Sequence, residues 1–179
     1  MRLIVLALAA LAVTAGCSAS PEVEPTREAP QSTAMTTTTT TAPTSAAPVE
    51  IVSFAGKGCE LIGPDLLAEL DINVSGASKG VAVCMWDDPE TKRRLMVRLI
   101  GDHDPLLEVR GAPNPVDSAV GGFPAKHVPE GRDNLCDIYV RTAPEQGFAA
   151  AYGIMDGTVD DLCAGAVRAA EQVAEKIKG

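Results

Sequence analysis

The residues with the most distinctive chemistry in this 179-residue chain are five cysteines and two histidines. A cysteine thiol can form a disulfide, bind a metal as thiolate or carry a lipid, and a histidine can act as a base or a metal ligand near neutral pH. Four of the cysteines lie after residue 50, whereas Cys17 stands alone directly after an apolar run at the start of the chain. The sequence therefore predicts a separate role for Cys17.

Residues 1–16 have the pattern of a signal peptide for export. Arg2 supplies the positive start, an apolar run follows from Leu3 to Val13, and small side chains lead to Cys17. A helix of this apolar run would span about 16 Å, roughly half of the hydrocarbon core of a bilayer. We therefore expect a signal peptide and no permanent transmembrane helix.

The residues around Cys17 resemble the lipobox of bacterial lipoproteins, because Ala15 and Gly16 stand directly before the cysteine. The pattern departs from that family at Thr14, where an aliphatic residue is usual. The resemblance implies a diacylglyceryl group on Cys17, cleavage before it, and an anchor on the extracytoplasmic face of the cell membrane. One acyl chain binds a membrane only marginally, so the anchor would need two or more chains, palmitate among them. The alternative is a plain signal peptide without lipid.

Residues 17–48 are predicted to be a disordered tether. Five prolines and a threonine run at 36–41 stand among Ser, Ala and Glu, and no apolar periodicity is present. Such a segment buries too little apolar surface to offset the entropy lost on ordering. It would hold the following domain about 30 Å from the membrane on average, as a bare or an O-glycosylated spacer. The folded domain is predicted at residues 49–179.

Four cysteines belong to this domain: Cys59, Cys84, Cys136 and Cys163. An even number in an exported domain favours disulfides, and three pairings are open. We favour Cys59–Cys84 and Cys136–Cys163, because each joins the region of a helix start to a nearby strand. Each would close a loop of about 25 residues and stabilise the fold by roughly 3–4 kcal/mol. A zinc site is the alternative, but no C-x-x-C pair is present.

The elements that must position these cysteines are read from turn residues and hydrophobic periodicity. A short helix is expected at residues 63–70 and a long amphipathic helix at 159–177, with Thr158 as cap and Asp160 and Asp161 at its positive end. Strands are expected at 81–86, 93–100, 135–141 and 147–154, and one after the turn Gly121–Gly122 that ends at Val128. The segment 147–154 is apolar on both faces, which suits a central strand, with a helix as the alternative.

Together these elements predict an α+β fold. A mainly antiparallel sheet would carry a short N-terminal helix and a longer C-terminal helix on one face, with two disulfides. The segments 81–86 and 93–100 would form a hairpin. In its second strand Leu95, Val97 and Leu99 share one face, and Arg94, Met96 and Arg98 share the other.

Other candidate chemistry is sparse, and we assign no catalytic, cofactor or metal site. The cluster Gly101–Pro105 sets His103 between two aspartates, which suits a divalent cation or a base, although Gly, Asp and Pro also form plain exposed turns. The basic residues 92–94 with Arg98 suit anionic headgroups or an acidic partner, or simply a solvated strand end. A formal charge of −9, from 24 acidic and 15 basic residues, argues against a nucleic-acid partner.

An ordered set of short motifs extends over the predicted domain. They are Cys59-Glu60-Leu61-Ile62 with Pro64, Cys84-x-Trp86, Gly122-Phe123-Pro124-Ala125, Cys136-x-Ile138-x-Val140 and Leu162-Cys163-Ala164-x-Ala166. This set resembles the actinobacterial lipoproteins of domain-of-unknown-function family 3558. The resemblance implies location in the cell envelope and a framework of four cysteines. It implies no activity.

The leading functional hypothesis is a membrane-anchored envelope lipoprotein whose domain binds a small amphiphile or another envelope protein without catalysis. The alternative is a carboxylate-dependent hydrolase acting on envelope material. An apolar pocket between helix and sheet would favour a small ligand, and two convergent carboxylates in a deep cleft would favour hydrolysis. A flat apolar patch would favour a protein partner.

Overall fold

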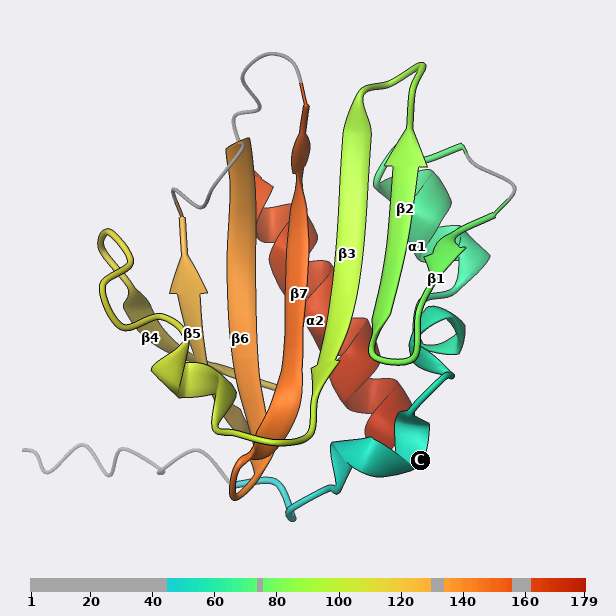
Figure 1. Ribbon diagram of the computed structural model, residues 1–179. Helices are drawn as coiled ribbons and strands as arrows, with labels where there is room; N and C mark the ends of the chain where they lie inside the picture. Colours follow the sequence, from blue (N-terminus) through green and yellow to red (C-terminus); the bar gives the residue numbers. More distant parts are fainter. Residues whose placement is uncertain (1–44, 74–75, 130–133, 156–161) are drawn as a thin grey trace, which may run out of the picture. The chain divides into compact units, whose positions relative to one another are not determined.

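The structure is a computed structural model that describes residues 45–73, 76–129, 134–155 and 162–179. Its main element is one antiparallel sheet of seven strands, in the order β1-β2-β3-β7-β6-β5-β4 (Figure 1). The strands are β1 Ser78–Lys79, β2 Val83–Asp88, β3 Arg93–Ile100, β4 Val116–Val120, β5 Phe123–Val128, β6 Leu135–Ala143 and β7 Gln146–Ile154. The predicted central strand is therefore confirmed as β7, at the middle of the sheet.

One long helix, α2 (Leu162–Lys178), crosses one face of the sheet and contacts β7, β6 and β4 (Figure 1). The N-terminal part of the described chain adds two 3-10 turns to the same core, η1 (Ile51–Phe54) and η2 (Gly58–Leu61). The six-residue segment α1 (Pro64–Glu69) follows them. A third 3-10 turn, η3 (Pro105–Leu107), lies in the connection from β3 to β4.

The predicted fold class needs correction. We expected a sheet with two helices, a short N-terminal one and a longer C-terminal one, on one face. The structure is instead mainly a seven-stranded sheet with a single C-terminal helix, and its N-terminal part contacts β2, β3 and β7 through the 3-10 turns η1 and η2. The segment Gly63–Leu70 contains only six helical residues, which is too short to form a second helical layer.

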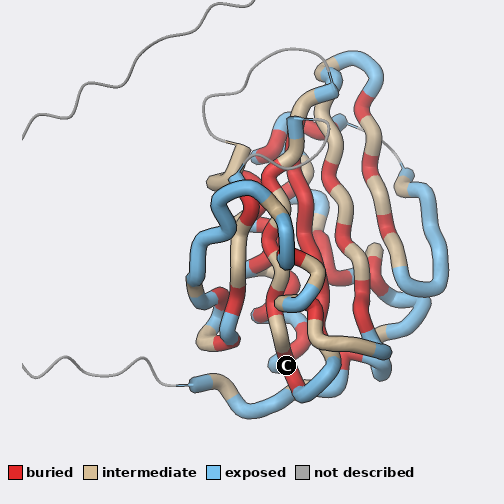
Figure 2. Tube along the Cα trace, turned by 60° about the vertical axis from the view of Figure 1, so that its left-hand side comes forward, coloured by how far each residue is buried: buried red, intermediate tan, exposed pale blue. Residues whose placement is uncertain are grey.

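Burial alternates along β2, β3 and β6, as the red and tan pattern of Figure 2 shows, whereas β7 is buried on both faces. We call the side that faces α2 the inner face. Leu95, Val97 and Leu99 lie on it as predicted, and Phe148 lies beside them on β7. The helix meets this face with small side chains, namely Gly165, Ala166, Ala169, Ala170 and Ala174, so it packs close to the strands.

Gly165 shows how closely α2 lies on the sheet. A Cβ atom at this position would lie 2.3 Å from a ring carbon of Tyr152, well inside van der Waals contact. The tyrosine ring is fixed in place, since its hydroxyl donates a hydrogen bond to the carbonyl of Leu70 at 2.9 Å. Glycine is therefore the residue that fits at this crossing.

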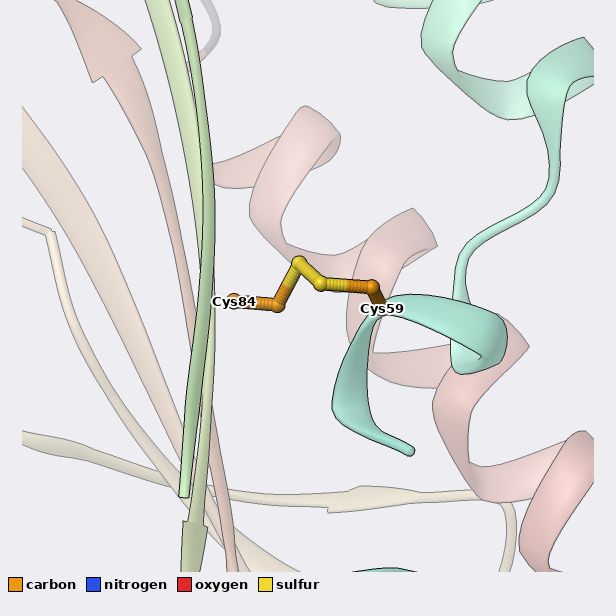
Figure 3. The surroundings of a disulfide bond; sticks show 2 residues. All are labelled: Cys59 and Cys84. Carbon is orange, nitrogen blue, oxygen red and sulfur yellow. A yellow bond between two sulfur atoms is a disulfide. The ribbon is translucent and has the colours of Figure 1, made fainter. Parts of the chain in front are cut away.

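Two disulfides link strands of the sheet covalently to segments that pack on its inner face. Cys59 on η2 bonds to Cys84 on β2 (Figure 3), and Cys136 on β6 bonds to Cys163 on α2. The favoured pairing is therefore the one found. Both strand cysteines are fully buried on the inner face, so each bond fixes a segment outside the sheet onto it.

The predicted hairpin is confirmed as β2 and β3, with Cys84 opposite Val97 and Asp88 opposite Arg93. Asp88 is buried and accepts backbone hydrogen bonds from Asn73 and Glu90. These bonds, the one from Asn73 first, hold the pKa of Asp88 below its ordinary value despite its burial. Its carboxylate thereby stabilises the turn between β2 and β3 and links the segment before β1 to that turn.

Strand β4 was not predicted. It pairs with β5 through the two-residue turn Gly121–Gly122, in which both residues have positive φ. This is the backbone of a type I′ hairpin turn, which favours glycine.

Several predictions lie outside the described residues: the signal peptide at 1–16, most of the tether at 17–48, and the helix cap at Thr158 with Asp160 and Asp161. The described chain begins at 45 and is attached to the domain at once, since Ala46 donates to the carbonyl of Gly122 and Val49 to that of Thr142. No helix in the described part of the chain has the length and apolar character needed to cross a membrane.

Candidate functional site

The side of the sheet away from α2 forms a trough, and we call it the open face. Its central strand, β7, carries only small residues on this side, among them Ala149 and Ala151. The flanking strands carry large ones: β3 has Arg94, Met96 and Arg98, and β6 has Leu135, Asp137 and Tyr139. The trough therefore follows from the residue sizes on three neighbouring strands.

A groove of about 750 Å³ occupies part of this face. Apolar and charged side chains both line it, and two of the apolar ones, Met85 and Met96, are direct cross-strand neighbours on β2 and β3. The lining residues are Met85, Arg94, Met96, Glu108, Val109, Arg110, Gly111, Ala112, Pro113, Val128, Leu135, Asp137 and Tyr139. The volume is in the range of sites for small organic ligands.

The connection from β3 to β4, residues 101–115, supplies one wall of the groove, and we call it the strap. Strands β3 and β4 follow each other in sequence but are separated in the sheet by β7, β6 and β5, so this connection has to cross the sheet. It crosses on the open face, in front of the strands in Figure 1. Pro105 lies directly over Gly147, where an added Cβ would come within 2.8 Å of its ring.

Side-chain ion pairs hold the strap to the two strands that flank β7. Asp104 pairs with Arg141 of β6 at 3.0 Å and also accepts a hydrogen bond from the backbone of Leu106 at 2.9 Å. Glu108 pairs with Arg98 of β3 through both carboxylate oxygens. The strap is thereby fixed across the small residues of the central strand.

His103 joins this network from within the strap. One of its ring nitrogens, Nε2, lies 2.7 Å from Glu108, and the other, Nδ1, lies 2.7 Å from Asp102. The hydrogen bond to Glu108 first, and that to Asp102 second, raise the pKa of His103 above its ordinary value. A protonated imidazole can donate to both carboxylates at once, which is the form that the geometry favours.

The carboxylate of Glu108 is held in its ionised form. Partial burial alone would raise its pKa, but hydrogen bonds from Arg98 and His103 outweigh burial and lower the pKa below its ordinary value. The same contact with Glu108 raises the pKa of Arg98. Glu108 is therefore suited to holding the strap and poorly suited to donating a proton.

The predicted cluster around His103 is only partly brought together. Asp102 and His103 are in contact, but Asp104 turns to Arg141 and its place is taken by Glu108, which the sequence reasoning missed. Nothing in the local spacing marks Glu108, because the strap must fold back for it to reach the histidine. Within the described ranges, no group of His, Cys, Asp or Glu side chains is arranged to hold a metal ion.

The predicted basic run does not form one basic surface. Arg93 lies toward the inner side and pairs with Asp71, whereas Arg94 lies on the open face and pairs with Asp87. Lys92 lies in the turn before β3 with positive φ and is exposed. The alternation of the strand thus separates three consecutive cations.

A second, more open hollow of about 510 Å³ lies where the described chain enters the domain. Its lining includes Ala46, Pro48, Leu107 and Arg141. Neither this hollow nor the groove is lined by residues of α2. The hollows therefore differ from the pocket between helix and sheet that would have favoured a small ligand, since the small side chains of α2 close that interface.

Comparisons with known proteins give one result. No curated protein sequence matches the chain, and no solved structure matches it. A family model described as "Protein of unknown function (DUF3558)" matches residues 12–176, which is nearly the whole chain and includes the sheet, the strap and all four disulfide cysteines. The chain therefore belongs to the DUF3558 family.

Proposed function

We propose that this protein is a membrane-anchored lipoprotein of the cell envelope whose domain binds a small amphiphile in the groove of the open face. The groove carries the proposal. Its lining comes from β2, β3, β5, β6 and the strap, and Met85 and Met96 side by side give it a flexible, polarisable apolar part. Methionine adapts its shape to irregular apolar ligands.

The proposed location of the protein in the cell rests on its N-terminal sequence. The apolar run before Cys17 and the lipobox-like residues around it support export and lipidation. Two disulfides in the domain agree with an oxidising compartment, where such bonds persist. We place the domain on the extracytoplasmic face of an actinobacterial membrane, held by the lipid on Cys17.

Binding is favoured over hydrolysis by the chemistry of the groove. A carboxylate-dependent hydrolase needs an acid whose pKa is raised toward neutral pH beside a second carboxylate. Glu108 has the opposite property, because Arg98 and His103 lower its pKa. A protein partner is less favoured than a small ligand, because the face is hollowed rather than flat.

A double variant, Met85→Gln with Met96→Gln, tests the groove. The substitutions keep the side-chain length but make the lining polar, so affinity for dodecanol, measured by titration calorimetry, should fall at least tenfold. The protein is the full chain carrying Cys17→Ser, purified without lipid and with both disulfides formed. The matched control is Val81→Gln, which changes an apolar side chain that is 77% exposed and outside the groove.

The anchor is tested separately by converting Cys17 to Ala and fractionating the cells. Loss of the protein from the membrane pellet is the expected result. Retention in the pellet would show that the anchor lies elsewhere.

A further inference from the structure

The charged side chains around the groove differ in whether they already have partners. Arg94 is paired with Asp87, and Glu108 is paired with Arg98 and His103. Asp137 also has an interaction partner. Arg110 is the exception among the groove's charges in the described chain: it lines the groove, is exposed, and forms no ion pair and no side-chain hydrogen bond.

The backbone that carries Arg110 is fixed although its side chain is not. The amide of Arg110 donates to the carbonyl of Leu107 at 3.2 Å, and the amide of Ala112 donates to Val109 at 3.0 Å. Val109 is buried at 4% exposure and fastens this turn to the protein, and Gly111 completes it with a φ of +86°. The guanidinium is thus presented from a hydrogen-bonded turn at the wall of the groove.

We infer that the ligand of the groove is a single-chain amphiphile with an anionic head group, a carboxylate or a phosphate, and that Arg110 binds this head group. This inference rests on the proposed function and adds the charge of the ligand to it. The apolar chain would lie along Met85 and Met96, where the lining is apolar. The other charged side chains of the groove already have partners within the protein. The unpaired Arg110 therefore determines the sign of the charge on the ligand head group.

The chemistry of arginine suits this role. Its planar guanidinium binds a carboxylate or a phosphate through two parallel hydrogen bonds, and it stays charged at any physiological pH. A cationic amphiphile would place like charge beside Arg110 and would have to compete with Arg98 and His103 for Glu108. A neutral alcohol would gain the apolar contacts alone.

The test compares four amphiphiles with the same chain: dodecanoate, dodecyl phosphate, dodecanol and dodecylamine. Their affinities are measured by titration calorimetry on the full chain carrying Cys17→Ser, with both disulfides formed. Arg110→Gln is expected to weaken dodecanoate and dodecyl phosphate about tenfold, because it removes a charge-assisted hydrogen bond. Dodecanol should change less than about twofold, since it does not use that bond. The ratio between the two anions tells a carboxylate ligand from a phosphate one.

Two control variants keep the result unambiguous. Lys176→Gln removes one positive charge from the exposed side of α2, outside the groove, and should leave all four affinities unchanged. Equal effects of Lys176→Gln and Arg110→Gln would mean that the preference for anionic amphiphiles comes from the overall charge of the protein. That result would overturn the inference. Arg110→Lys should restore part of the affinity for the anions, because it restores the charge without the planar fork.

The failure of the inference can be told from the failure of the proposed function. If Met85→Gln with Met96→Gln weakens every amphiphile but Arg110→Gln weakens none, the groove binds and the assignment of Arg110 is wrong. If neither change affects any amphiphile, the groove is not the binding site and both are wrong. Tighter binding of dodecylamine than of dodecanoate by the unsubstituted groove would also overturn the inference.

Discussion

The two faces of the sheet are built from the same strands but by different physics. The inner face is closed by apolar contacts, two disulfides and a helix with small side chains. The open face is crossed by a strap that ion pairs hold in place, and it leaves a groove beside the strap. Because successive side chains of a strand point to opposite faces, mutations at two neighbouring positions act on different faces of the sheet.

The difference separates stability from binding. Burial of apolar surface on the inner face supplies the larger part of the folding free energy, whereas partly exposed ion pairs contribute little. Side chains on the open face are therefore free to serve a ligand with little cost to the fold. Substitutions on the two faces can test this division.

The largest contrast is expected between Phe148 and Met96. Phe148→Ala removes a fully buried ring from the inner face and should lower the free energy of unfolding by about 3–5 kcal/mol. Met96→Ala on the open face, where the side chain is only half-buried, should cost less than about 2 kcal/mol. Urea unfolding followed by circular dichroism measures both, and equal losses would contradict the division.

Removal of the disulfide between β6 and α2 is the next largest effect. The pair Cys136→Ala and Cys163→Ala opens a loop with a sequence separation of 27 residues. The chain-entropy relation gives a loss of about 3.5 kcal/mol for such a loop. The urea midpoint should fall accordingly, while the affinity of the groove for dodecanol, measured under conditions where the variant is folded, stays unchanged. A large loss of affinity in the folded variant would show that the faces are coupled.

A smaller effect is expected where the strap is attached. Glu108→Gln breaks the ion pair with Arg98 and the contact with His103, and it should cost about 1 kcal/mol or less, since these groups are partly exposed. Hydrogen exchange should rise at the amides of Leu107 and Arg110 and remain slow in β3. Uniformly faster exchange would mean that Glu108 supports the whole fold and not the strap alone.

The smallest effect is the titration of His103. Its pKa is raised, so the folded state favours the protonated ring. The resulting stabilisation is fully present below the ordinary pKa of about 6.5 and is lost as the pH rises through the higher folded value. An NMR titration should place the pKa of His103 above 6.5, and Glu108→Gln should lower it. An unchanged value in Glu108→Gln would assign the shift to Asp102 instead.

Much of the sheet follows from local sequence. Alternation identified both faces of β3, and the apolar character of both faces of segment 147–154 favoured the central strand that β7 forms. The pairing of Cys59 with Cys84 and of Cys136 with Cys163 followed from the elements on which these residues lie. Strand β4 was missed although a signal was present: two consecutive glycines predict a hairpin turn, and a hairpin turn requires a strand on each side.

The groove could not be predicted, because it depends on strand order. Only when β7 lies between β3 and β6 do the large side chains of those two strands stand on either side of its small residues. The same order forces the strap to cross the sheet and brings Glu108 to Arg98 and His103. The error about the N-terminal helix has a local cause, since the six-residue segment that follows two 3-10 turns has the composition of a helix but not its length.

In-cell photocrosslinking tests the central claim, that the open face is the binding face, most directly. Met96→p-benzoylphenylalanine places the crosslinker in the groove, and Arg168→p-benzoylphenylalanine places it on α2, across the sheet. Mass spectrometry of the lipidated protein should find a small anionic amphiphile attached at position 96 and none at position 168. The same adducts at both positions, or only protein adducts at position 96, would contradict the account.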